Sequence, residues 1–246
     1  MIRQKTNFIF HSIIQLFWPA VCINCNKSIN ETENNLCNEC WNELIVCTGS
    51  DFCTRCGREA SIAGKIDGVC PDCQGKEIFF DGIARAGIYD NTLKTMILAL
   101  KNGKTELDNA LGFLADSALQ GSEFYKDIDL FVPVPLHWTR KLKRGYNQAG
   151  IIAGKLNHPS AKINTDLVRI KKTKMQPTMV SPAARSKNVE GAFTIRYGHK
   201  FNGKNICLID DIKTTGATLN ECAKTLKNAG VNKVFALVLA VAGQKI

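Results

Sequence analysis

Eight cysteines in four C-x2-C pairs constrain the first third of the chain more than any other feature. Eleven residues separate the first two pairs and thirteen separate the last two, so two consecutive blocks share one plan. A C-x2-C turn presents two thiolates on one side, and two such turns complete a tetrahedral Zn²⁺ site at sulfur–metal distances of ~2.3 Å. The predicted metal ligands are Cys22, Cys25, Cys37, Cys40, Cys53, Cys56, Cys70 and Cys73.

Disulfides and an iron–sulfur centre are the alternatives for these cysteines. Disulfides need an oxidising compartment, and the sequence shows no credible secretion signal. With sulfur at every position, neither zinc site leaves room for a catalytic water, so we expect the metal to act as a folding device. The turns could pair in sequence or interleave, and the repeated spacing favours pairing in sequence. Of the other cysteines, Cys207 and Cys222 are expected to be buried, and Cys47 lies between the blocks.

The first twenty residues predict a short amphipathic helix. Apolar side chains recur there at helical spacing, and polar residues interrupt the run that would otherwise resemble a signal peptide. We expect this helix to pack on the rest of the protein, with weak membrane attachment as the alternative. The apolar positions are Ile9, Ile13, Leu16 and Phe17, and the interruptions are His11, Ser12 and Gln15.

Two adjacent acids follow an apolar strand near the C-terminus. Ile206 to Ile209 precede Asp210 and Asp211, and a loop with three threonines around Gly216 comes next. Paired carboxylates at the end of a strand can accept hydrogen bonds from a ribose diol. The N–H groups and hydroxyls of such a loop can surround a phosphate where a helix begins, because the helix dipole favours an anion there. The alternative is an ordinary strand-to-helix turn with capping threonines.

Apolar strands alternate with helical patterns through the last two-thirds of the chain. This alternation predicts an α/β fold with a mostly parallel sheet covered by helices on both faces. Ligands bind beyond the carboxyl ends of the strands in such sheets, which is where the paired acids fall. The expected strands are 81–89, 130–136, 167–168, 205–210 and 234–241, and the expected helices are 91–101, 107–119, 145–156 and 217–229.

Positive charge is concentrated in one stretch. The chain carries a net charge of +10, yet Arg140 to Lys187 contains twelve basic residues and one acid, Asp166. A solvated basic surface would also look like this, but a window so poor in acids favours a phosphate-rich ligand.

The start of this window has the chemistry of a polyanion site. Arg140 and Arg144 can grip phosphate oxygens in a bidentate manner, and Trp138 and Tyr146 offer flat surfaces for a base. We expect this segment to form a basic loop after the proline-rich strand. The alternatives are that Trp138 fills the core and that residues 144–148 only begin a helix.

These motifs carry two family resemblances. Residues 210–218 resemble the phosphoribosyl-pyrophosphate (PRPP) signature of the type I phosphoribosyltransferases. The chain as a whole resembles the ComF family of bacterial competence proteins. The features that carry this resemblance are, in chain order, two four-cysteine ribbons, Val132-Pro133-Val134-Pro135, Arg144-Gly145-Tyr146-Asn147-Gln148 and the PRPP signature. Further matching blocks are Leu100-Lys101, Arg169 with Lys172-Thr173 and Gln176, and Arg185 with residues 188–193.

The ComF resemblance implies the architecture and the site residues. After the amphipathic helix expected over residues 1–20, it implies a double zinc ribbon over 21–76 and a type I phosphoribosyltransferase fold over 77–246. The residues implied to bind PRPP are Asp210, Asp211, Lys213, Thr214, Thr215, Gly216, Ala217 and Thr218. The residues expected to contact phosphate or DNA are Arg140, Lys143, Arg144, Tyr146, Asn147, Gln148, Arg169, Lys172 and Arg185.

The resemblance also implies partners and cofactors. ComF proteins are tied to natural transformation, act on incoming single-stranded DNA at the cytoplasmic side and work with a competence helicase. We therefore expect a cytoplasmic protein, peripheral at the inner membrane face at most, with two structural Zn²⁺ ions. The alternative is an active phosphoribosyltransferase that uses PRPP with Mg²⁺ and an unknown acceptor. Purine-salvage enzymes have an acid where this chain has Thr214, so a purine base is a less expected acceptor.

Overall fold

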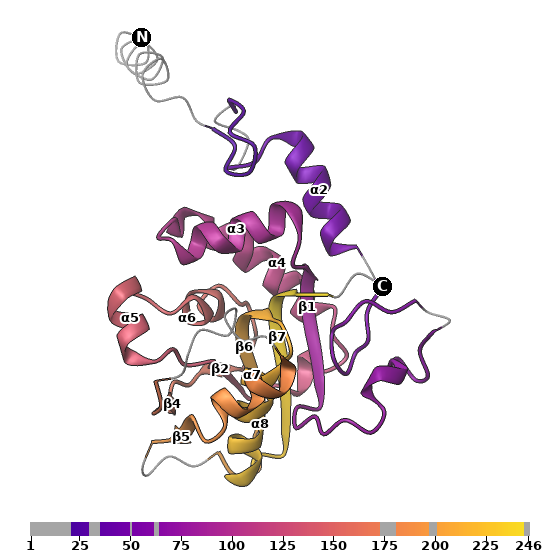
Figure 1. Cartoon of the computed structure of the whole chain (residues 1–246), viewed down its shortest axis with the longest axis vertical. Coiled ribbons are helices and arrows are strands. Elements are labelled where there is room, and N and C mark those ends of the chain that lie inside the picture. Colours follow the sequence, from indigo (N-terminus) through magenta and orange to yellow (C-terminus); the bar gives the residue numbers. More distant parts are fainter. Residues whose placement is uncertain are drawn as a thin grey trace.

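A five-stranded parallel sheet forms the centre of the protein (Figure 1). The computed structural model describes residues 21–29, 35–49, 51–61, 64–172, 181–196 and 201–243. The strand order is β1-β7-β6-β2-β3, which confirms the expected mostly parallel sheet. The strands are β1 (Gly82–Ile88), β2 (Leu130–Pro133), β3 (Lys162–Ile163), β6 (Asn205–Lys213) and β7 (Lys233–Val241).

Helices cover both faces of this sheet. On one face, α3, α4 and α6 bury an apolar core that includes Leu93, Leu111 and Ile152. On the other face, α8 buries Leu219 and Leu226, with α7 packed beside it. Because the central strands are covered twice, β7 is an almost unbroken apolar run. The helices are α3 (Asn91–Lys101), α4 (Asp108–Gln120), α6 (Gln148–Ala153), α7 (Pro182–Val189) and α8 (Ala217–Asn228).

Several boundaries differ from the sequence predictions. The strand expected to stop at residue 210 continues through both acids to Lys213, because β7 pairs with it along that length. The strand expected over 130–136 ends at Pro133. The basic segment expected as a loop is a short helix, α5 (Trp138–Arg144), which His137 caps and which ends at Gly145 with φ +82°. Short 3-10 turns lie at Pro71–Cys73, Thr105–Leu107 and Tyr125–Asp127.

A small antiparallel pair stands apart from the main sheet. Strand β4 (Leu167–Arg169) pairs with β5 (Phe193–Ile195), so the predicted short strand at 167–168 forms but joins no parallel sheet. Leu167 and Phe193 anchor the pair in the core on the α8 side. The predicted family positions Thr173 and Gln176 lie outside the described residues.

The two cysteine blocks precede the sheet and begin with the same turn. The main-chain N–H of Cys22 donates to the Lys27 carbonyl at 2.8 Å, and that of Cys53 donates to the Arg58 carbonyl at 2.9 Å. Asn26 and Gly57, at the same place in the two turns, have positive φ angles. The blocks then diverge, because the first continues into α2 (Asn38–Thr48) beside α3. The helix predicted for residues 1–20 lies outside the described residues. Within the part of the chain that the structure describes, no helix has the length and apolarity needed to cross a bilayer.

Candidate functional site

The first cysteine block brings four thiols into one cluster. The sulfur atoms of Cys22, Cys25, Cys37 and Cys40 all lie within 4.8 Å of one another. The side chain of Asn24 supports the cluster, because its Nδ2 donates to Cys40 Sγ at 3.3 Å and to Thr92 Oγ1 at 3.0 Å. Since Thr92 is on α3, the first ribbon is tied directly to the helical layer of the sheet domain.

The second block forms an equivalent cluster from Cys53, Cys56, Cys70 and Cys73. The Cys53–Cys73, Cys56–Cys70 and Cys70–Cys73 sulfur pairs are 3.8, 3.7 and 3.7 Å apart. A ZnS4 tetrahedron with bonds of ~2.3 Å has edges of about 3.8 Å, whereas a disulfide bond is about 2.05 Å. The thiols therefore fit zinc and are not bonded in pairs, and the pairing in sequence is confirmed.

The paired aspartates lie where the chain changes direction across the sheet. After β2 the chain crosses to β3, and after β6 it crosses the opposite way to β7. The point where the strands diverge, beyond the carboxyl ends of β2 and β6, is the usual ligand position in open α/β sheets. The basic segment after β2 and the acids near the end of β6 both lie at this end of the sheet.

Asp210 and Asp211 have different surroundings. Asp210 accepts the main-chain N–H of Asp211 at 2.9 Å. Burial and the neighbouring Asp211 carboxylate raise the pKa of Asp210 to about 7. Asp211 instead forms an ion pair with Lys101 of α3, at 3.0 Å between Nζ and Oδ2, and these side chains are only 20% and 14% exposed. One acid is thus poised to exchange a proton near neutral pH, while a lysine compensates the charge of the other.

The raised pKa of Asp210 predicts a pH-dependent stability. Its unfolded-state pKa is about 3.9, so the stability from the protonated form is fully present below that value and is lost as pH rises through about 7. We expect Asp210→Asn, which stays neutral, to raise the free energy of unfolding at pH 8 by at least about 1.4 kcal/mol, the value of one pKa unit. Urea unfolding at pH 4 and pH 8 measures this. An equal effect at both pH values contradicts the prediction, and the surface variant Glu106→Gln is the control.

The loop after β6 turns sharply into α8. Gly216 has φ +84° and immediately precedes the first residue of the helix. Thr215 Oγ1 accepts the N–H of Ala217 at 3.4 Å, and Lys213 is buried beneath the loop. A Cβ at position 216 would lie 3.0 Å from Cε of Lys213 and would also require a strained φ, so glycine keeps this turn close to the lysine.

Basic side chains from two segments converge beside the acids. Burial and the charges of Arg169, Lys172 and Arg140 all lower the pKa of His137. Burial lowers the pKa of Arg169, with a further contribution from Arg140, and Arg169 is also near enough to Asp210 to lower the pKa of that carboxyl. The β4 strand thus carries Arg169 between the basic helix and the carboxylates, and its guanidinium lies 5.2 Å from the Phe193 ring centroid.

The aromatic residues of the basic segment have separate roles. Trp138 is 63% exposed on α5, so it does not fill the core, and Leu142 one turn later is 75% exposed. Tyr146 is half-buried and donates its hydroxyl to the Leu100 carbonyl, which ties the segment to α3. Among these rings, Trp138 is the one that the structure leaves open for stacking.

The remaining polar residues of this segment begin α6. Asn147 caps the helix, since Oδ1 accepts from Ala149 N at 3.2 Å and Nδ2 donates to Val134 O at 3.1 Å. Gln148 is buried, and among the described residues its Nε2 has no hydrogen-bond partner. Lys143 is exposed and Arg144 half-buried at the end of α5, and Arg185 is half-buried on α7 against the α8 side.

The comparisons with known proteins match this two-part architecture. The double zinc ribbon domain family matches residues 13–74, and the phosphoribosyl transferase domain family matches residues 142–246. Competence protein F of Haemophilus influenzae is 28% identical over 225 residues, which cover 89% of this chain and 95% of that protein. The chain belongs to the ComF family.

Other ComF relatives also align along nearly their whole length. Competence protein ComFC of Bacillus subtilis is 28% identical over 229 residues, covering 85% of this chain and 90% of that protein. The DNA utilization protein YhgH of Escherichia coli is 24% identical over 222 residues, covering 88% and 94%. The ribbons and the sheet domain are therefore shared as one unit with these proteins.

Lys101 is the residue of this ComF-family site whose role the sequence did not reveal. It matched a family block, but its ion pair with Asp211 depends on how α3 packs over the end of β6. Arg58 and Lys76 also lie beside the loop that leads into α8, although they belong to the second cysteine block and the segment after it. Their spacing along the chain carries no signal of this proximity.

Proposed function

We propose that this chain takes part in the uptake or processing of single-stranded DNA during natural transformation and binds PRPP or a related sugar phosphate. The observation that carries the proposal is that Arg169 lies near both Asp210 and Arg140, at the end of the sheet where β2 and β6 diverge. The names of the relatives, competence proteins and a DNA utilization protein, support the biological setting.

In this proposal the carboxylates bind the ribose hydroxyls and the loop from Lys213 to Thr218 surrounds the phosphate. The loop ends at the N-terminus of a twelve-residue helix, where unbonded N–H groups and the helix dipole favour an anion. Mg²⁺ bound together with PRPP would supply positive charge to offset that of the pyrophosphate. Lys101 holds Asp211 in place, and the partly neutral Asp210 can donate or accept a hydrogen bond near neutral pH.

DNA contact is assigned to the basic helix α5 and its surroundings. Arg140, Lys143 and Arg144 come from this helix, Arg169 and Lys172 from the β4 region, and Arg185 from α7. Exposed Trp138 offers a stacking surface among these charges. A sequence-independent grip on phosphates predicts that affinity falls steeply with salt. A competence helicase is the expected partner, and weak membrane attachment would depend on residues 1–20.

A ligand panel on the purified full chain tests both assignments. We expect PRPP with Mg²⁺ to bind the wild-type protein and to lose at least about a hundredfold in affinity in Asp210→Ala/Asp211→Ala, because the ribose loses its charged acceptors. We expect a single-stranded oligonucleotide to lose about tenfold or more in Arg140→Ala/Arg144→Ala and to weaken as salt rises. Calorimetry reports the first and fluorescence anisotropy the second.

Each variant pair is the control for the other. If calorimetry detects no PRPP binding to the wild-type protein, the sugar-phosphate assignment is wrong. An oligonucleotide that binds equally well at low and high salt removes the DNA assignment.

A second candidate function is phosphoribosyl transfer itself, and the complete loop from Thr214 to Thr218 favours it. Stabilisation of the ribosyl oxocarbenium and of the departing pyrophosphate would supply the catalysis. Release of pyrophosphate in the presence of acceptor nucleophiles is the measurement. We also propose that the ribbon domain ends at residue 76 and that the sheet domain begins at residue 77.

A further inference from the structure

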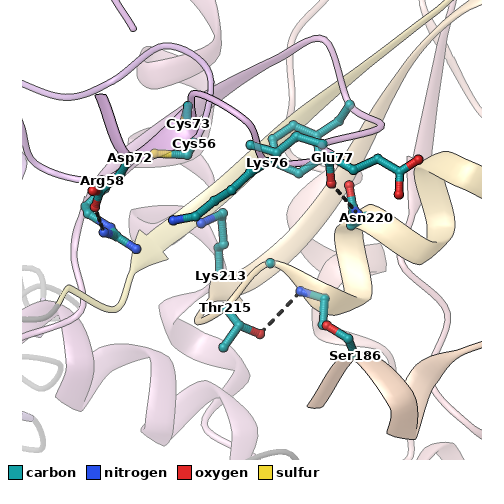
Figure 2. A pocket seen from close by; sticks show the side chains of 14 residues that line it. Cys56, Arg58, Asp72, Cys73, Lys76, Glu77, Ser186, Lys213, Thr215 and Asn220 are labelled. Atoms are coloured by element: carbon teal, nitrogen blue, oxygen red, sulfur yellow. Dashed lines mark hydrogen bonds and ion pairs between the residues drawn. The ribbon is translucent and has the colours of Figure 1, made fainter. Parts of the chain in front are cut away.

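A cavity of about 280 Å³ lies between the second cysteine cluster and the loop that leads into α8 (Figure 2). Cys56 and Cys73 line it on the side of the ribbon, together with Lys76. Lys213 and Gly216 line it on the side of the loop. In Figure 2 the side chain of Lys213 rises from the loop toward the cysteine block, so it is directed from one part of the protein to the other.

The main chains of Lys213 and of the second cluster both contact the end of β7. Lys213 is the last residue of β6, pairs with Val241 in the sheet and accepts the main-chain N–H of Ala242 at 2.8 Å. Gly57, which follows Cys56, packs on the same valine, because a Cβ at Gly57 would lie 3.0 Å from its Cγ2. The sheet therefore sets the distance between the cluster and Lys213, and no free linker separates them.

The aliphatic stem of Lys213 lies directly against the turn of the loop. A Cβ at Gly216 would lie 3.0 Å from Cε of Lys213 and 3.6 Å from its Nζ. Gly216 has φ +84° and immediately precedes the first residue of α8. The turn that begins this helix is therefore in contact with the lysine, and a shift of the stem would remove that support.

The ammonium of Lys213 needs negative charge beside it, because Lys213 is only 8% exposed. The second cluster supplies this charge. Burial lowers the pKa of Lys213, and the thiolates of Cys56, Cys73 and Cys53 oppose that effect. A zinc ion with four thiolates carries two negative charges, so the metal-bound cluster can still compensate the buried lysine.

The other cations that line the cavity depend less on the cluster. Arg58 is half-buried and paired with Asp72, and Lys76 is exposed to solvent. Lys213 is thus the buried cation of this cavity, and it contacts the loop as well.

We propose that Lys213 is a positioning residue that joins the second cysteine cluster to the loop. The cluster holds the ammonium, and the stem supports the turn at Gly216. Loss of metal from this cluster then loosens the loop, so the second ribbon has a role beyond its own folding. The inference rests on the proposed function for what the loop binds, but the link between cluster and loop does not depend on the ligand.

The competing explanation is that Lys213 serves only the ribbon. In that case the lysine compensates the thiolates, and the loop keeps its shape through its own turn and the pairing of β6 with β7. The two explanations differ in what happens to the mobility of the loop when either the lysine or the metal is removed.

The test compares Lys213→Met, which removes the charge and keeps most of the stem, with Lys213→Arg, which keeps the charge. Lys65→Met is the matched control, because Lys65 belongs to the same ribbon, donates to the Phe52 carbonyl at 3.3 Å and does not line the cavity. Zinc affinity is measured by competition with a chelator, the order parameters of the loop amides by NMR relaxation, and PRPP affinity with Mg²⁺ by calorimetry, all on the full chain.

We expect one of the two zinc ions to bind about tenfold or more weakly in Lys213→Met, the usual effect of losing a residue that supports metal ligands. The order parameters of the amides from Thr214 to Ala217 should fall from about 0.85, typical of rigid backbone, to below about 0.6. PRPP affinity should fall several-fold. Lys213→Arg should recover most of each loss, and Lys65→Met should show none.

A double variant shows whether the lysine and the cluster act together. Cys56→Ser should lower the order parameters of the loop as Lys213→Met does, because it removes the metal that holds the ammonium. Lys213→Met/Cys56→Ser should lower them no further, since both changes break the same link. The amides of Ile206 to Ile209, in the buried part of β6, should stay rigid in all variants and show that the sheet is intact.

Three outcomes overturn the proposal. Wild-type zinc affinity and loop order in Lys213→Met would show that the lysine makes no link. Weaker zinc binding with an unchanged loop would assign the lysine to the ribbon alone. Additive losses in the double variant would mean that the lysine and the cluster act on the loop independently. If PRPP does not bind the wild-type protein, the proposed function fails, while the zinc and NMR measurements still decide the link.

Discussion

Replacing Cys56 with serine is expected to release one of two bound zinc equivalents and to unfold the second ribbon. The three remaining thiols, Cys53, Cys70 and Cys73, cannot complete the tetrahedron that their spacing of 3.7–3.8 Å fits. Structural zinc contributes about 10–16 kcal/mol in zinc-finger peptides, more than the apolar contacts of such a short segment can replace. This is the largest effect that we expect from any single substitution.

The damage should extend into the sheet domain. A Cβ at Gly57 would lie 3.0–3.3 Å from side-chain atoms of Val241 and Ile83, and Ile83 N donates to the Thr54 carbonyl at 2.9 Å. The second ribbon thus covers strands β1 and β7. We expect a lower unfolding temperature for the whole protein as well as exposure of the ribbon to proteases.

Zinc stoichiometry, thermal unfolding and limited proteolysis measure these effects. Cys47→Ala is the matched control, because Cys47 is a buried cysteine outside both clusters. It should retain two zinc equivalents and lose only the stability of a small buried side chain. Retention of two equivalents by Cys56→Ser would show that the second cluster is not a zinc site.

Lys101→Met is expected to destabilise the fold by about 1.5–3 kcal/mol, the usual contribution of a hydrogen bond to a charged group, because it removes one partner of a largely buried ion pair. Lys101 Nζ lies 3.0 Å from Asp211 Oδ2, and both side chains are largely buried. Asp210 immediately precedes Asp211 in the chain. Without the lysine, two adjacent carboxylates lose their nearest cation in a poorly solvated site. Methionine keeps most of the aliphatic stem, so the loss reports the charge.

Urea unfolding of single and double variants measures this second effect. The double variant Lys101→Met/Asp211→Asn should recover most of the stability, because no uncompensated carboxylate remains at position 211. Lys204→Met is the matched control: its pair with Asp129 spans 3.8 Å between exposed side chains, so we expect less than about 1 kcal/mol. A loss in Lys101→Met no larger than in this control would contradict the prediction.

The sequence predicted the local geometry of the site well. Both cysteine clusters formed with the predicted members, and the paired acids lie at the carboxyl end of a buried strand that leads into a helix. It was less successful with α5, which was expected as a loop, and with the end of β6. A short helix without a buried face has no apolar periodicity to reveal it, and the extent of β6 depends on its pairing with β7.

The amino-acid sequence alone determined the two metal clusters, the alternation of strands and helices, and the carboxylate and threonine motif, because each depends on residues only a few positions apart or on a strand or helix period. The tertiary structure alone decided which cations meet these motifs: Lys101 at Asp211, Arg169 near Asp210, and Lys76 across the cavity from Lys213. Such contacts join residues tens of positions apart, and the packing of whole helices and ribbons on the sheet determines them.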